Sequence, residues 1–143
     1  MVSRQHLLSG HPVCNFMIHP SVRVAAHNKY LNEVKNTLQY LTGTSGTEAF
    51  RQELKQEYDC YLPTKMEAKS FKEVYGYVHK LLQENLVHVM TLNGKSDVDS
   101  SMYAKGSNII IGGNTLGRGV TFGSLETVLY TRTSRKPQAD TMW

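Results

Sequence analysis

Four short apolar runs, separated by longer stretches of helical periodicity, constrain the fold of this chain more than any other feature. The runs cover residues 13–18, 86–92, 108–111 and 127–131. Their length and apolar content are typical of buried strands. Helical connections between such strands imply βαβ crossovers, and therefore a mostly parallel sheet flanked by helices. The sequence thus predicts an α/β fold.

The long connection between the first two strands is predicted to hold three helices. They begin near Val22, Thr47 and Met66, and the first ends near Thr42-Gly43 while the third continues to Asn85. Thr47 is a suitable N-cap for the second helix. A further helix is predicted in the tail, where Pro137 suits a first turn.

The third apolar run ends in a glycine-rich segment, and residues 108–122 read NIIIGGNTLGRGVTF. Its four glycines are Gly112, Gly113, Gly117 and Gly119. Glycine permits unusual backbone angles and a close approach of a ligand to backbone N–H groups. A turn of this kind with Arg118 could cradle an anion or phosphate, although a loop shaped only by packing explains the run equally well.

Polar loops follow three of the predicted strands, and in a parallel sheet they would share the ligand-binding carboxyl edge. The candidate anion-binding residues are His19, Ser21 and Arg23 in the first loop, Lys95 and Ser96 in the second, and Thr115 and Arg118 in the third. Each of them alone is more simply explained as a surface residue. Together, on one edge, they favour contact with phosphates.

Several other kinds of site lack their motifs. There is no Walker lysine after Gly117, no GxGxxG and no HExxH, so neither a self-sufficient ATP site nor a metal site is predicted. Acid and lysine pairs two residues apart, as in Glu33-Val34-Lys35, fall on predicted helices, where this spacing is commonplace. No catalytic residue is assigned.

Composition sets broad limits on location and partners. A net charge of +4 permits a polyanionic partner without requiring one. Cys14 and Cys60 are not in a CxxC pair, which indicates a reducing cytoplasm rather than a disulfide framework. No apolar stretch approaches the length of a membrane span, so no membrane association is predicted.

Two blocks of the sequence resemble a known family. FMIHPSVRVAAHNKYLNEV and IIIGGNTLGRGVTFGSLETVLYTRTSRKPQADTMW are similar to the C-terminal lobe of the Z-one domain family. Its members are bacterial proteins described as candidate endonucleases, related to superfamily-two helicases and linked with restriction systems. The likeness runs from about Val13 to Trp143, with residues 1–12 as a linker, and it is most specific in GGNTLGRGVTF.

The resemblance implies a three-layer RecA-like lobe, similar to the second lobe of a DNA translocase. It implies DNA as a partner, contacted through the backbone by the three loops, with ATP and Mg²⁺ bound between this lobe and a first lobe. The motif loop would comprise Gly112, Gly113, Asn114, Gly117, Gly119 and Thr121. Many relatives have aspartate at the position of Thr121, so the duty of that residue is open.

The same resemblance implies that the chain is a fragment. It ends before the sixth helicase motif and contains no first lobe, so the fragment alone should be inactive and should bind no cofactor tightly. Two other readings stay open. One is a non-catalytic RecA-like scaffold for protein partners, and the other is a small binder of a phosphate metabolite. A GxxxxGK[ST] loop encoded upstream would favour the ATP-driven parent over the scaffold.

Overall fold

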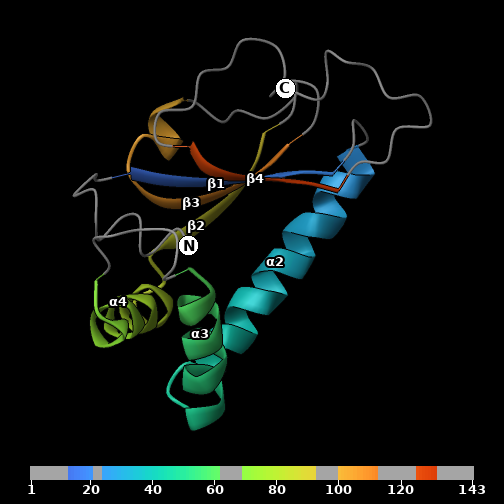
Figure 1. Cartoon of the computed structure of the whole chain (residues 1–143). Coiled ribbons are helices and arrows are strands. Elements are labelled where there is room, and N and C mark those ends of the chain that lie inside the picture. The colour runs from blue at the N-terminus through green and yellow to red at the C-terminus, as the bar shows by residue number, and fades with distance from the viewer. Residues whose placement is uncertain (1–12, 21–23, 62–68, 93–99, 113–124, 132–143) are drawn as a thin grey trace.

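The computed structural model describes residues 13–20, 24–61, 69–92, 100–112 and 125–131 (Figure 1). In chain order the elements are β1 (Val13–His19), α2 (Val24–Thr44), α3 (Glu48–Tyr61), α4 (Phe71–Gln83), β2 (Val87–Leu92), the short 3₁₀ helix η2 (Ser100–Tyr103), β3 (Gly106–Gly112) and β4 (Leu125–Tyr130). The three α-helices lie between the first two strands, as predicted.

The four strands form one sheet in the order β2-β3-β1-β4, and every neighbouring pair is parallel. The predicted α/β class with a parallel sheet flanked by helices is therefore confirmed. The arrangement is compatible with a three-layer RecA-like lobe. β1 and β3 occupy the centre, which explains why Ile110 and Ile111 on β3 are completely buried.

The described helices α2, α3 and α4 lie on one side of the sheet, and η2 lies on the other (Figure 1). Tyr77 on α4 reaches the helical side of the sheet, where burial raises the pKa of its phenol and a side-chain hydrogen bond with Ser107 opposes the rise. On the opposite side, Tyr103 of η2 packs in a buried cluster with Met90, Leu92 and Ile110. Both faces of the central strands are thus covered.

The third helix begins later than the sequence pattern predicts. Ser70 has extended backbone angles and forms a reciprocal capping box with Glu73, so α4 starts at Phe71 rather than near Met66. It ends at Gln83, before Asn85, whose φ of 53° is left-handed. The predicted cap of the second helix is confirmed, since the amide of Phe50 donates to the Thr47 hydroxyl at 3.2 Å.

The bounds of all four strands differ by one or two residues from those predicted, and those of β3 and β4 differ most. β3 begins at Gly106, two residues before the predicted start at Asn108, because Gly106 pairs with β1 and Ser107 pairs with both β1 and β2. β4 begins at Leu125 and ends at Tyr130, one residue before the predicted end at Thr131. The helix η2 was not predicted, since its four residues are too short for a periodic signal.

Candidate functional site at the carboxyl edge of the sheet

The carboxyl ends of all four strands lie along one edge of the sheet. Leu92 pairs with Gly112, and His19 pairs with Tyr130. Because Ile18 pairs with Ile111, the next residues, His19 and Gly112, lie level with each other. These four last strand residues form a row, which spans roughly 14 Å at the usual spacing of neighbouring strands. The segments that follow the strands therefore start from a short common rim.

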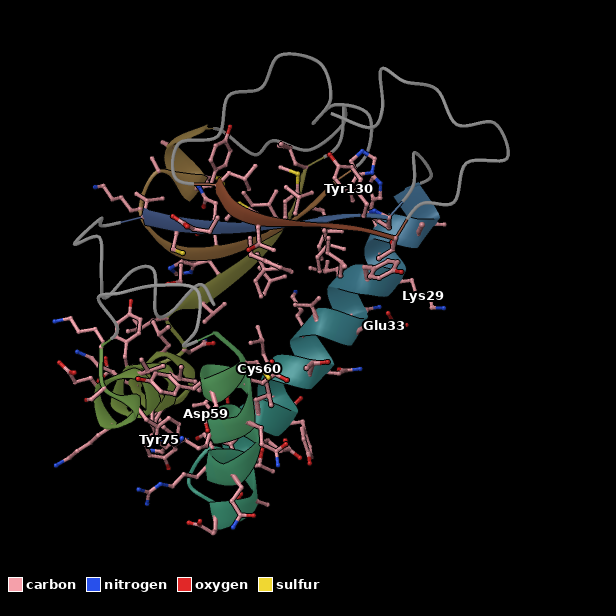
Figure 2. All side chains as sticks on the ribbon, viewed as in Figure 1. Lys29, Glu33, Asp59, Cys60, Tyr75 and Tyr130 are labelled. Carbon is pink, nitrogen blue, oxygen red and sulfur yellow. The ribbon has the colours of Figure 1, made fainter. Side chains whose placement is uncertain are left out.

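His19 is the one candidate side chain with a described position on this rim. It is buried, with 8% of its surface exposed, and its ring centroid lies 5.3 Å from that of Tyr130. The amide of Thr131 donates to the His19 carbonyl at 3.2 Å. Figure 2 labels Tyr130 at the end of β4. These contacts give His19 a packing role between β1 and β4, and its contact with a ligand stays a prediction.

Gly112, the first glycine of the glycine-rich run, is the last residue of β3. It is buried and pairs with Leu92 on β2. β3 therefore delivers the rest of the motif loop directly to the rim, between the ends of β2 and β1. This is the position at which a ligand binds in an open parallel sheet.

The other candidates lie outside the described residues. They are Ser21 and Arg23, Lys95 and Ser96, and, in the motif loop, Gly113, Asn114, Thr115, Gly117, Arg118, Gly119 and Thr121. The strands that lead into all three of these segments are parallel and end on the same rim. The convergence of the strand ends is thus observed, while the contacts of these residues with a ligand stay a prediction.

A buried pair of asparagines lies toward the other end of the same strands. Asn15 on β1 and Asn108 on β3 are at most 1% exposed, and Asn108 Nδ2 donates to Asn15 Oδ1 at 2.8 Å. Asn15 Nδ2 donates to the Tyr103 carbonyl at 3.3 Å, and Asn108 Nδ2 to the Lys105 carbonyl at 3.0 Å. The pair joins the η2 segment to the sheet. This pair was not predicted. The sequence signal for it was one asparagine in each of two apolar runs, Asn15 in residues 13–18 and Asn108 in residues 108–111.

The described side chains offer little catalytic chemistry. Burial, followed by the nearby Glu126 carboxylate, raises the pKa of the Cys14 thiol to about 11, so this thiol is not a nucleophile at neutral pH. Cys14 and Cys60 are both free. In the described ranges, no three His, Cys, Asp or Glu side chains come together in a way that could hold a metal ion. None of the helices described combines the length and hydropathy that a bilayer crossing requires.

A comparison with protein-family models matches the Z1 domain over residues 2–143. The chain belongs to the Z1 family. Neither the comparison with curated proteins nor that with solved structures gave a match.

The match confirms the Z1 (Z-one) family that the sequence resembles and covers both of the blocks that carry the resemblance. The relation to helicases stays a prediction. In this Z1 chain, the GGNTLGRGVTF block starts at the end of a central strand of a parallel sheet. The most specific sequence block of the chain therefore begins at the rim where the four strands end.

Proposed function

We propose that this Z1 chain is a lobe that contacts the backbone of DNA and helps to complete an ATP site in a bacterial helicase-like protein of a restriction or defence system. The observation that supports the proposal most strongly is the row of strand ends at His19, Leu92, Gly112 and Tyr130. The three loops that are candidates for phosphate binding all start from this row, so the points at which they leave the sheet are close to one another.

The proposed contacts are chemically simple. Backbone N–H groups of a glycine-rich turn and the guanidinium of Arg118 are suitable donors to phosphate oxygens. Arg23 and Lys95 would add charge from the neighbouring loops. Contacts of this kind do not distinguish bases, so binding should depend strongly on salt and weakly on sequence.

ATP and Mg²⁺ enter the proposal only through the resemblance. The side chains of the described rim, His19, Leu92 and Tyr130, include no carboxylate for Mg²⁺ and no permanent positive charge for a triphosphate. These residues do not fit a complete nucleotide site. Any ATP site would need groups from the loops and from a first lobe, and no reaction step is assigned to this lobe.

The test is a titration of labelled single- and double-stranded DNA with the whole chain. Arg118→Ala should weaken binding of many unrelated sequences to the same extent and should lower the slope of log K against log salt by about 0.7 to 0.9, the loss of one phosphate contact. Lys72→Ala, which changes an exposed lysine on α4, is the matched control and should leave both quantities unchanged. Equal affinities of wild type and Arg118→Ala would reject the assigned role of Arg118.

A protein-interaction scaffold is the second candidate, and it is favoured by exposed apolar side chains on β4, which lies at the other edge of the sheet that the structure describes. Leu129 is 46% exposed and Tyr130 is 59% exposed. If the chain binds neither form of DNA at low salt while Leu129→Ser abolishes binding to a protein partner from the same gene cluster, the scaffold is the better description.

A further inference from the structure

The outer side of β2 borders an open groove that the proposed DNA contacts do not use. Among the described strands β2 lies at one edge of the sheet, and the groove beside it has a volume of about 940 Å³. Residues of α2 and the end of α4 line one wall, and η2 with Lys105 lines the other. The groove runs along the side of the sheet, so it is distinct from the rim at the strand ends.

The strand beside this groove can form further backbone hydrogen bonds. In an edge strand, alternate residues direct their N–H and C=O groups away from the sheet. Within the described ranges, β2 pairs with β3 on one side and with no strand on the other. An extended peptide is the ligand whose backbone matches such an edge.

Apolar side chains flank the strand on both walls. Leu38 of α2 lines the wall on the helical side, and Met102 of η2 lines the other. Met102 is 52% exposed, which is unusual for a large apolar side chain and leaves its surface available for contact. Val89 and Met90 of β2 lie between them along the groove. A strand placed here could bury side chains on both of its faces.

The charge of the groove is positive. Lys35 stands on the α2 wall and Lys105 follows η2 on the other wall, and both side chains are exposed. None of the described residues that line the groove carries a carboxylate. Each lysine is therefore available to a carboxylate from a ligand.

We propose that this groove binds an extended segment of a protein partner that adds as a strand beside β2 and carries both apolar and acidic side chains. The backbone of the segment pairs with β2, its apolar side chains pack on Leu38 and Met102, and its carboxylates meet Lys35 and Lys105. A nucleic-acid strand fits less well, because two lysines neutralise few phosphates and the described lining offers only the imidazole of His88, with no Phe, Tyr or Trp ring, for base stacking.

The test uses the whole chain and a fluorescein-labelled peptide of repeating Val-Val-Glu-Glu, as long as β2, because side chains alternate along a strand and this repeat puts both valine and glutamate on each of its faces. Fluorescence anisotropy should show binding to the wild type, and the double variant Lys35→Glu/Lys105→Glu should weaken it at least tenfold. The same variant should gain affinity for the matching peptide of repeating Val-Val-Lys-Lys. Lys72→Glu is the matched control and should behave as the wild type, and circular dichroism should show that every variant is folded.

Hydrogen exchange tests the pairing itself. Amides of β2 (Val87–Leu92) should exchange more slowly with the valine-glutamate peptide, and the effect should vanish with a peptide N-methylated at alternate residues. Failure of the peptide to bind, binding that the charge reversal leaves unchanged, or loss of single-stranded DNA binding alone in the double variant would each overturn the proposal. Arg118→Ala should leave peptide binding intact, so a failure of the proposed DNA contacts can be distinguished from a failure of the peptide site beside β2.

Discussion

At the scale of single residues, the hydrogen bond between the buried side chains of Asn108 and Asn15 is a polar contact whose loss should lower the stability of the fold. Removing Asn108 deprives Asn15 Oδ1 of a donor 2.8 Å away in a site that is almost fully buried. We expect Asn108→Ala to lower the free energy of unfolding by about 1–3 kcal/mol. Urea unfolding measures this, and Asn15→Ala with Asn108→Ala completes a double-mutant cycle. Strict additivity of the two single effects would show that the pair is not coupled.

Cys14 makes stability depend on alkaline pH. Burial first and Glu126 second raise the pKa of its thiol to about 11 in the folded chain, above the value of about 8.5 for an unfolded cysteine. The folded state therefore holds this proton more tightly, and the associated stability is complete below the unfolded pKa and lost as pH rises through the folded pKa. The free energy of unfolding of Cys14→Ala should fall less steeply from pH 9 to 11 than that of the wild type. Parallel curves would contradict this assignment.

At the scale of elements, local chemistry decides where the helices begin and end. Periodicity located all three helices, and Thr47 correctly marked the start of α3. It placed the start of the third helix too early, because Met66 continues the apolar pattern while the capping box of Ser70 and Glu73 fixes the actual start. The first part of β3, Gly106 and Ser107, was likewise missed, since the pairing of Ser107 with both β1 and β2 outweighs the low strand propensity of the preceding glycine.

The capping box of α4 can be tested by one substitution. In Ser70→Ala the amide of Glu73 loses its acceptor, so we expect a loss of about 1 kcal/mol in the free energy of unfolding. Thermal or urea unfolding measures the loss. Ser101→Ala, an exposed serine in η2, is a comparison substitution outside the cap. An unchanged stability of Ser70→Ala would mean that packing alone fixes the start of the helix.

The same box depends on pH in the acid range. Hydrogen bonds from the Ser70 side chain and then its backbone hold the pKa of Glu73 below its ordinary value. Its contribution is present above the unfolded pKa and is lost as pH falls through the folded pKa. We expect Glu73→Gln to lose less stability than the wild type on acidification below pH 5, and identical acid profiles would contradict this role of the carboxylate.

At the scale of the whole molecule, the sequence predicted the class of the fold and the convergence of the loop-bearing strand ends, but not the order of the strands. A run such as residues 108–111 shows that a strand is buried, yet it does not say which strands lie beside it. The central place of β3 depends on pairing with β1 and β2, which are far from each other in sequence. The groove beside β2 had no sequence signal for the same reason, because α2, β2 and η2 meet there only in the folded chain.

The arrangement of the layers predicts an order of local opening. β1 and β3 lie at the centre of the sheet and carry fully buried side chains. By contrast, α3 packs chiefly on α4 through contacts between aromatic rings, such as those of Tyr58 and Phe71, whose centroids lie 5.5 Å apart. Segments with few buried contacts open at lower free energy than the core. Native-state hydrogen exchange should therefore show α3 amides exchanging through local opening and those of β1 and β3 only through global unfolding. Phe71→Ala should speed exchange in α3 more than in β3, and equal acceleration in both would mean that the helical layer and the sheet open as one unit.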